Sequence, residues 1–528
     1  MSLKSEMIKN LKINSMKKLL SLGIIAVMVT TFFACSEDDP NLASPTFTIP
    51  TPGDVEVGGT ATIDFAYTAA AGFASSAVTA TGGTAVIATD GTAGATSGTI
   101  SVTFTAGTTA GPGSVTLTVT DNEGDVNSAT AVFQVAAEVL VFTITSNITA
   151  NATWETGKTY ILGGRIAVVD GVTLTIEPGV VVKGEAGSGA NATALLIARG
   201  AKLMAEGTAS QPIIFTSIAD ELEPGQIASP NLDTDLSGLW GGLIILGKAP
   251  ISAPGSVEAF QIEGVPPSDQ NGLYGGTNAT DNSGVIKFVS IRHGGANIGE
   301  GNEINGLTLG GVGSGTVIEN IEIVANQDDG IEFFGGTVSV KNAIVWNSGD
   351  DAIDTDQAWS GTLDNFIVIG GADTDHAMEI DGPEGSFLGT PHTLKNGTIK
   401  IFTTGTPPVA GPGGGEIADL RSNARANFEN IYVFNLHGGS DWELDNAGVS
   451  ANYLAGLITF LNIQINTSNL TSPPSIATIF KDDGGNDAQF NTDAAGFASI
   501  VTTPTTGATK SSFAGWSWAD AIDELTGF

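Results

Sequence analysis

The chain has 528 residues, with 20 Lys plus Arg against 56 Asp plus Glu, so its formal net charge is −36. This acidity excludes a generic nucleic-acid binder, because phosphate contacts need clustered Lys and Arg. The single cysteine excludes a disulfide scaffold and any zinc site built from several cysteines. With 70 glycines and 41% hydrophobic residues, the composition predicts a large all-β protein of two or three domains.

Residues 1–34 have the pattern of a secretory signal peptide. Two lysines at positions 17 and 18 precede an apolar run over residues 19–34, which is shorter than the ~20 residues of a membrane span. The run ends in Phe-Phe-Ala before Cys35, which resembles the lipobox of bacterial lipoproteins and implies acylation of Cys35. Residues 36–39 (Ser-Glu-Asp-Asp) resemble the acidic export signal of Bacteroidetes lipoproteins; the alternative is a solvated linker. The resemblance implies an outer-membrane, lipid-anchored protein that faces the cell exterior.

A short acidic tether over residues 35–46 leads into a region of short strands over residues 47–137. Apolar residues occupy every second position at 61–67, 99–104 and 115–119, and Gly, Asp and Asn separate these runs. Period-two alternation with such breaks predicts an antiparallel β-sandwich. The pattern is similar to bacterial immunoglobulin-like and PKD-type domains, a resemblance that implies a spacer module.

A repeat begins near residue 141 and predicts a second domain over residues 141–480. Six segments place an apolar residue two positions before an Asn and another three positions after it, with gaps of 22, 23, 31, 34 and 32 residues. A fixed register with a minimum period near 22 predicts a solenoid of short strands, a right-handed parallel β-helix. Asn suits a bend because it tolerates the left-handed conformation, and equivalent Asn side chains can stack. These residues are Asn320, Asn342, Asn365, Asn396, Asn430 and Asn462.

Earlier coils lack the Asn but keep the strand pattern, at residues 172–183, 195–204, 213–216, 240–246 and 286–291. Polar stretches at 218–238 and 252–282 are predicted to be excursions over one face of the solenoid. Residues 481–528 are predicted to form a C-terminal cap, in which the amphipathic stretch 513–525 covers the open end and prevents edge-to-edge growth.

Three phrases in this domain resemble a Bacteroidetes family of outer-membrane β-helix lipoproteins. They are Leu-Thr-Ile-Glu-Pro-Gly-Val at 174–180, Trp-Gly-Gly-Leu-Ile-Ile-Leu-Gly-Lys-Ala-Pro-Ile at 240–251 and Asp-Asp-Gly-Ile-Glu-Phe-Phe-Gly-Gly at 328–336. The resemblance covers about residues 140–528. It implies the β-helix fold and the location, and it implies little about activity.

Acidic residues follow Asn320 and Asn342 at offsets of +8, +9 and +12, and they follow Asn365 with a slip of one or two residues. The coil after Asn396 breaks the pattern, and the next coil offers Asp441, Glu443 and Asp445. Neighbouring coils lie about 4.8 Å apart, so equivalent carboxylates are expected to form a column. One role for this column is calcium binding, because calcium takes roughly 6–8 oxygen ligands and would fit between the coils. The alternative roles are capping of the backbone amides of turns, and catalysis. The predicted metal ligands are Asp328, Asp329, Asp350, Asp351, Asp354, Asp373 and Asp375; Glu332, Glu379, Asp381 and His376 accompany them.

Catalysis is an alternative because β-helix polygalacturonases use an Asp-Asp pair on one coil and another Asp on a neighbouring coil. Gln327-Asp328-Asp329 and Gly349-Asp350-Asp351 resemble that pair, but the Gly-His-Gly and Arg-x-Lys motifs of those enzymes do not occur. The alternative catalytic residues are Asp329, Asp351, Asp375 and His376. Three aromatic residues near the acidic coils, Trp346, Trp359 and Trp442, suit sugar stacking, although burial in the solenoid explains them equally well.

The sequence therefore predicts a surface lipoprotein that acts as a non-enzymatic binding or adhesion module for a glycan or another surface polymer. The first alternative is a calcium-dependent polysaccharide lyase or glycoside hydrolase, and the second is a structural protein of the cell envelope. The expected partners are membrane lipid through acylated Cys35 and a polysaccharide, with calcium as the expected cofactor if there is one.

Overall fold

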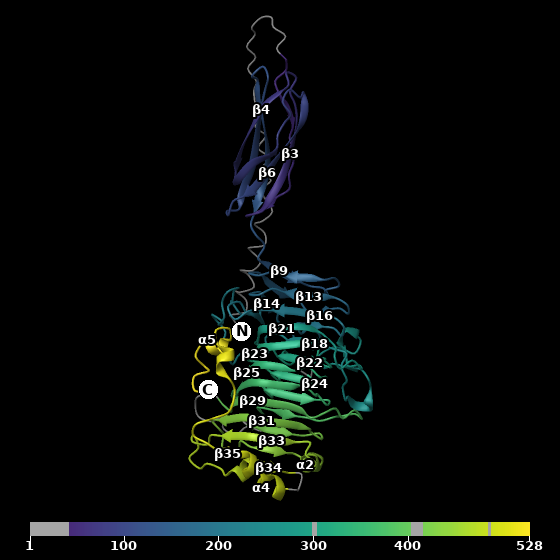
Figure 1. Ribbon diagram of the computed structural model, residues 1–528, viewed down its shortest axis with the longest axis vertical. Coiled ribbons are helices and arrows are strands. Elements are labelled where there is room, and N and C mark those ends of the chain that lie inside the picture. Colours follow the sequence, from purple (N-terminus) through teal and green to yellow (C-terminus); the bar gives the residue numbers. More distant parts are fainter. Residues whose placement is uncertain (1–41, 298–303, 403–415, 484–486) are drawn as a thin grey trace, which may run out of the picture. The chain divides into compact units, whose positions relative to one another are not determined.

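The computed structural model describes residues 42–297, 304–402, 416–483 and 487–528 (Figure 1). The described residues form two compact units, which lie within Met1–Glu138 and Val139–Phe528. Cys35 and the acidic residues that follow it, together with the predicted signal peptide, lie outside the described residues. No helix in the described part of the chain combines the length and the apolar character that crossing a bilayer requires.

The first unit is a sandwich of two four-stranded sheets that share one apolar core. Ile63, Phe65, Phe104 and Leu117 are buried at alternating positions, as the period-two pattern predicts. One sheet contains, in order, β1 (Thr46–Thr48), β3 (Thr60–Thr68), β6 (Ser97–Ala106) and β5 (Gly83–Thr89). The other contains β2 (Val55–Glu56), β8 (Val126–Ala136), β7 (Gly111–Asp121) and β4 (Phe73–Thr81).

The second unit is a right-handed parallel β-helix, as the repeat predicts, and its coils are stacked in chain order (Figure 1). One wall of the solenoid is a parallel sheet of ten short strands. In order, they are β12 (Arg165–Val168), β15 (Ala194–Ile197), β18 (Leu243–Leu246), β22 (Leu307–Gly310), β24 (Ile331–Phe334), β26 (Ile353–Asp356), β28 (Glu379–Ile380), β30 (Ala418–Leu420), β32 (Trp442–Leu444) and β34 (Phe480–Asp482).

A fifteen-stranded sheet makes the other walls. Its first coils carry two separate rows of strands: β10 (Ala152–Trp154), β13 (Thr173–Ile176) and β16 (Lys202–Glu206) in one, and β9 (Val141–Ile144), β11 (Thr159–Leu162), β14 (Val181–Gly184) and β17 (Ile213–Ser217) in the other. Both rows pair with β21, where they merge. The merged strands are β21 (Gly284–Arg292), β23 (Val317–Val324), β25 (Val340–Trp346), β27 (Thr362–Ile369), β29 (His392–Lys400), β31 (Ala426–Phe434), β33 (Thr459–Ile465) and β35 (Ala498–Ile500).

Each repeat asparagine forms the bend within one merged strand, as its tolerance of positive φ predicts. The six φ angles lie between 55° and 62°. Their side chains stack: Asn342 Nδ2 donates to Asn320 Oδ1 at 2.8 Å, and Asn365 Nδ2 donates to Asn342 Oδ1 at 2.6 Å. The ladder is interrupted once, where Asn396 Nδ2 donates to Asp364 Oδ1 instead, and then continues to Asn430 and Asn462.

Loops and short helices complete the second unit. Residues 218–238 contain no helix or strand, as predicted for an excursion, whereas the excursion at 252–282 carries the hairpin β19 (Phe260–Gln261) and β20 (Leu273–Tyr274). The α-helices are α2 (Ala447–Leu454), α3 (Ile476–Ile479), α4 (Asp487–Phe497) and α5 (Trp518–Ala521).

The prediction that residues 513–525 cover the open end of the β-helix is wrong. The segment runs back along the outside of the solenoid (Figure 1). There, Phe513 and Trp518 pack on outward apolar side chains of β23, β25 and β27. Those side chains would otherwise face water, which explains where the segment docks. α4 packs against β34 and β33 at the last coils instead: Phe497 meets Phe480 of β34 edge to face with ring centroids 5.2 Å apart, and it stacks on Phe460 of β33 at 4.9 Å.

Candidate functional site

Outward-pointing carboxylates form a column on the ten-stranded sheet. Parallel pairing places Glu332 beside Asp354, so their shared offset of +12 becomes direct adjacency in space, and it places Asp354 beside Glu379, which lies at +14 from its asparagine. The column continues through Asp419 and Glu443 before Lys481 ends it. We call the carboxylates of this column and of the turns before it the acidic face: Asp328, Asp329, Glu332, Asp350, Asp351, Asp354, Asp375, Glu379, Glu416, Asp419, Asp441 and Glu443.

The fifteen-stranded sheet has an outward column of opposite character. Its residues alternate in charge from coil to coil in the order Lys287, Glu319, Lys341, Asp364, Lys395 and Glu429. Ion pairs join Lys287 to Glu319 at 3.3 Å and Lys395 to Asp364 at 3.7 Å. The same solenoid therefore compensates stacked charges on one wall and leaves like charges stacked on another, where adjacent carboxylates repel.

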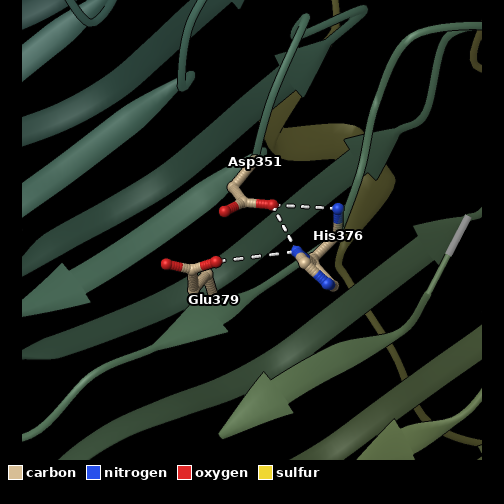
Figure 2. A group of neighbouring side chains, drawn as sticks. All are labelled: Asp351, His376 and Glu379. Carbon is tan, nitrogen blue, oxygen red and sulfur yellow. Dashed lines mark hydrogen bonds and ion pairs between the residues drawn. The ribbon is translucent and has the colours of Figure 1, made fainter. Parts of the chain in front are cut away.

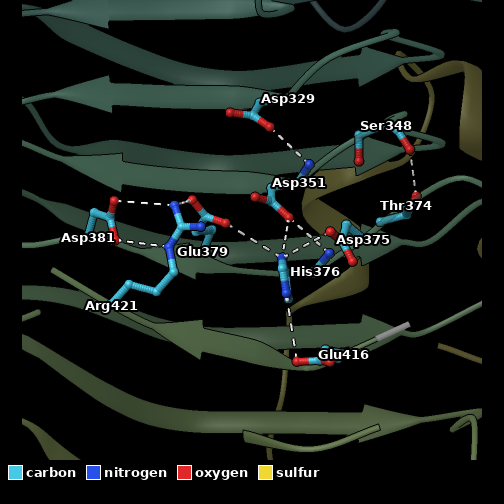
Figure 3. A network of polar contacts seen from close by, with 10 residues as sticks. All are labelled: Asp329, Ser348, Asp351, Thr374, Asp375, His376, Glu379, Asp381, Glu416 and Arg421. Carbon is cyan, nitrogen blue, oxygen red and sulfur yellow. Dashed lines mark hydrogen bonds and ion pairs between the residues drawn. The ribbon is translucent and has the colours of Figure 1, made fainter. Parts of the chain in front are cut away.

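Two of the predicted ligands also cap the following coil. Asp329 Oδ1 accepts a hydrogen bond from the backbone N–H of Asp351 at 2.9 Å, and Asp351 Oδ1 accepts one from the N–H of His376 at 2.9 Å. Figure 3 shows these residues one above another on successive coils. The turn-capping alternative is thus observed for Asp329 and Asp351, and each keeps a second oxygen for another interaction.

His376 lies at the centre of the acidic face (Figures 2 and 3). Its Nδ1 lies 2.7 Å from Asp351 Oδ1, 3.7 Å from Glu379 Oε2 and 3.9 Å from Asp375 Oδ2, and its Nε2 lies 3.7 Å from Glu416 Oε2. Burial by itself lowers the pKa of His376, but the hydrogen bond and charge of Asp351, with the charges of Asp375 and Glu416, raise it to about 9. The ring is therefore an imidazolium at neutral pH, which can neither ligate a metal nor act as a base.

Arg421 adds a second cation to this part of the face. Its Nε and Nη2 atoms lie 3.2 Å and 3.3 Å from the two carboxylate oxygens of Asp381, and it also contacts Glu379 (Figure 3). Asp351, His376 and Glu379 bring three potential ligand atoms within 4.8 Å of one another. Because His376 and Arg421 already compensate these carboxylates, this group is a poor cation site at neutral pH.

Asp329, Glu332 and Asp354 form a different group, which we call the oxygen cluster. One oxygen of each lies within 4.8 Å of the others, and in the described part of the chain no Lys, Arg or His forms an ion pair with them. Burial and, after it, the charge of Asp354 raise the pKa values of Asp329 and Glu332 well above their usual range. The pKa of Asp354 itself is raised in the same way by burial and by the charge of Asp356. Asp354 Oδ1 is buried without a hydrogen-bond partner among the described residues.

Two residues that sequence reasoning missed complete the surroundings of the oxygen cluster. Asn305, 1% exposed, donates through Nδ2 to a carboxylate oxygen of Glu332 and, at 3.2 Å, to Glu263 Oε1. Burial raises the pKa of Glu263, which comes from the excursion at 252–282. The sequence shows that this excursion exists, but it carries no periodic signal that would place Glu263 beside Glu332. The four carboxylates offer oxygen ligands of the kind that calcium prefers, and Asn305 presents its NH2 group to two of them.

Two further acidic groups lie along the same wall. Asp328, Asp329 and Asp350 approach one another within 4.8 Å on the turns, and Glu416, Asp441 and Glu443 do so near its end. Lys481 contacts Asp441 and so compensates the second of these groups. The predicted ligand Asp373 is exposed and belongs to none of the acidic groups found in the described part of the chain.

The prediction that the three tryptophans stack on sugars fails for Trp359 and Trp442. Trp359 is 1% exposed, stacks on Phe333 with ring centroids 3.9 Å apart and donates from Nε1 to the Val338 carbonyl. Trp442 is fully buried and packs on Phe480. Both side chains face the interior of the solenoid, where no ligand reaches them. Trp346 is 3% exposed and lies against Trp518, in the wall of a cavity outside the acidic face.

The family described as "Pectate-lyase like beta helix domain" matches residues 146–519. Among solved structures, one similar to this chain is a Family 28 exopolygalacturonase from Yersinia enterocolitica, with 12% sequence identity and a TM-score of 0.22 over 87% of this chain and 90% of that chain. No curated protein matches the sequence.

Proposed function

The chain belongs to the pectate-lyase-like β-helix family, and from that premise we propose that it binds a polysaccharide at the cell surface through calcium held on the acidic face. The observation that carries the proposal is the oxygen cluster, in which carboxylate oxygens of Asp329, Glu332 and Asp354 lie within 4.8 Å of one another without a compensating cation among the described residues. A divalent cation between them would favour the ionised carboxylates against the burial and mutual repulsion that raise their pKa values.

Calcium fits this cluster better than other common cations do. The available ligand atoms are carboxylate oxygens, and calcium accepts irregular sets of roughly 6–8 oxygens. Three carboxylates, with the carboxylate of Glu263 nearby, would supply part of that number. The remaining positions would be open to water or to hydroxyl and carboxylate groups of a sugar chain. Without a bridging cation, an acidic polysaccharide would be repelled from this wall.

The proposal includes display on the exterior of the outer membrane. This part of the proposal rests on Cys35 as the lipidated residue and on the acidic residues that follow it as an export signal. Acyl chains on Cys35 would anchor the protein, because each buried CH₂ contributes about 0.8 kcal/mol to membrane binding. Changing Cys35 to Ser tests this part: the variant should leave the membrane fraction, and whole-cell proteolysis should no longer remove the protein. Membrane retention of the Cys35→Ser protein would contradict it.

Calcium titration by calorimetry tests the central claim, followed by retention of polysaccharides on immobilised protein with calcium or with EDTA. Wild-type protein should bind calcium and retain at least one polysaccharide only when calcium is present. A Glu332→Gln/Asp354→Asn variant should lose both properties, whereas Glu319→Gln, on the charge-alternating column, should keep them. Retention that persists in EDTA, or calcium binding that survives the double change, would refute the proposal.

A hydrolase or lyase is the second candidate, and one observation favours it. Asp329, Asp351, Asp375 and His376 are joined in one chain of contacts across three coils (Figure 3). A protonated His376 could donate a proton to a leaving group, and a nearby carboxylate could accept one. New reducing ends or unsaturated uronates that disappear with Asp351→Ala would make the protein an enzyme. If it neither turns over nor retains any polysaccharide, a structural role in the envelope is the remaining proposal.

A further inference from the structure

Two loops meet beside the acidic face. One is the excursion at 252–282, and the other is the loop at 381–391 between β28 and β29. They are joined directly, because the backbone N–H of Ser386 donates to Ser256 Oγ at 2.9 Å. The same excursion carries Glu263 to the oxygen cluster. The place where the loops meet is therefore part of the surroundings of the carboxylates that would hold calcium.

The end of β26 holds both loops in place. Gln357 follows this strand, and its side chain lies between the loops. Its Oε1 accepts from the hydroxyl of Tyr274 in the excursion at 2.9 Å, and its Nε2 donates to Glu384 Oε2 in the other loop at 3.0 Å. Asp354 of the oxygen cluster lies three residues before Gln357 on the same strand. The junction of the loops is thus fixed at one end of the row of carboxylates that β26 contributes.

Four exposed apolar side chains lie around this junction, and we call them the apolar rim. Phe260 is 36% exposed and Phe387 is 43% exposed, and no other aromatic side chain in the described part of the chain is exposed. Val257 and Leu388 are 42% and 57% exposed. Each of the four lies within four residues of the hydrogen bond between the loops, which is no more than about 14 Å of extended chain. Clustered apolar groups at a surface, unlike single ones, mark a site of interaction.

The chemistry of the apolar rim restricts what can lie on it. Its four side chains contain no hydrogen-bonding atom, so a sugar hydroxyl buried there would lose its water without gaining a partner. Acetyl and methyl groups carry apolar carbon that gains from such burial. Beside the rim, calcium on the acidic face would attract the carboxylate of an acidic sugar. An occupant that satisfies both surfaces carries acidic groups and apolar substituents on one chain.

We propose that the apolar rim selects acidic polysaccharides whose sugars carry acetyl or methyl groups. This inference rests on the proposed function, because calcium in the oxygen cluster holds the acidic sugars while the rim receives the substituents of neighbouring ones. The rings of Phe260 and Phe387 also offer a surface for the C–H face of a sugar. The oxygen cluster then supplies the calcium-dependent affinity, and the rim supplies the choice between substituted and unsubstituted polymers.

Retention of alginate and of chemically O-acetylated alginate of the same chain length, on immobilised protein in calcium, tests the proposal. Wild-type protein should retain the acetylated polymer at least about fivefold more strongly. Phe260→Ser/Phe387→Ser should lose this preference and still retain unmodified alginate, because the oxygen cluster is unchanged. Phe260→Leu/Phe387→Leu should keep most of the preference, since leucine is also apolar. The control Val132→Ser/Leu461→Ser removes two exposed apolar side chains elsewhere and should keep all of it.

Equal retention of the two polymers by wild-type protein, or a preference that survives in Phe260→Ser/Phe387→Ser, would overturn the proposal and leave the calcium site standing. Calcium titration separates the remaining outcomes. A protein that binds calcium but retains neither polymer refutes the selection of substituted acidic polymers alone, whereas one that binds no calcium refutes the proposed function as well. Calcium-dependent binding to phosphatidylglycerol vesicles in preference to the acetylated polymer would assign the rim to a lipid surface and overturn the proposal.

Discussion

Raising the pH should destabilise the β-helix when divalent cations are absent. Burial, with repulsion from Asp445, Glu416 and Asp381, raises the pKa of Asp419 to about 7 against the lowering effect of His376. The pKa values of the oxygen cluster are shifted in the same direction. A carboxyl group with a raised pKa holds its proton more tightly in the folded state, so the stability it contributes is complete below about pH 4 and is lost as the pH rises through 7.

The magnitude follows from the shift. A rise in the pKa of Asp419 from 3.8 to about 7 corresponds to about 4 kcal/mol at full strength. Because solvent reaches part of this side chain, we expect about 1–2 kcal/mol from it. The oxygen cluster adds to the loss with the same sign. Calcium bound to the cluster stabilises the ionised carboxylates, so it should remove the cluster's share of the loss.

Urea unfolding near pH 4.5 and pH 7.5, in EDTA and in calcium, measures this effect. All seven tryptophans lie in residues 139–528, so tryptophan fluorescence reports on the β-helix without the sandwich. In EDTA, the free energy of unfolding should fall by at least about 1–2 kcal/mol between the two pH values, and calcium should restore part of it. Glu332→Gln/Asp354→Asn should show a smaller fall and no response to calcium.

A free energy of unfolding that is unchanged or higher at pH 7.5 in EDTA would refute the electrostatic reasoning. A normal fall that calcium does not reduce would instead refute only the assignment of calcium to the oxygen cluster. Glu319→Gln is the control, because its column alternates in charge, and it should preserve both the fall and the response.

Three further changes test the fold around the site. Asn342→Ala should lower the free energy of unfolding by about 2–3 kcal/mol, because it removes two ladder hydrogen bonds and places Ala at φ 57°. Asn342→Gly should lower it by about 1 kcal/mol less, and equal costs for the two variants would show that the φ angle is unimportant. Glu322→Ala should lower the free energy of unfolding by about 3–5 kcal/mol by leaving Arg292 buried without its partner, and limited proteolysis should then remove the C-terminal segment. An Arg292→Met/Glu322→Leu protein should regain only part of that stability, because the backbone N–H groups of Trp518 and Ala519 still lack the acceptor that Glu322 provides. A loss under about 1 kcal/mol for Glu322→Ala would contradict the role of the pair. The charged His376 contributes up to about 3 kcal/mol to the free energy of unfolding; this contribution is complete below pH 6.5 and is lost as the pH rises through 9. His376→Gln should therefore flatten the decline of stability between about pH 7 and pH 9.5. An unaltered decline would show that the imidazolium is not stabilised by its neighbours.

The sequence by itself determined the β-helix and the acidic column. In a solenoid, equivalent positions of successive coils are neighbours in space, so a fixed offset in the sequence becomes a contact. The repeat asparagines identified the bend because few other residues tolerate its positive φ, as Asn320 and Asn342 show. The same logic placed Glu332 beside Asp354, and it placed Asp354 beside Glu379 despite the longer coil between them.

Only the tertiary structure decided what the segments outside the repeat contact. Glu263 reaches the oxygen cluster from an excursion whose length gives no register, and the C-terminal segment docks on the side of the solenoid because outward apolar residues such as Ile344 need cover there. The charge of His376 likewise depends on four carboxylates gathered from several coils. Contacts between coils repeat with the sequence, whereas these depend on burial and charge between segments that share no period.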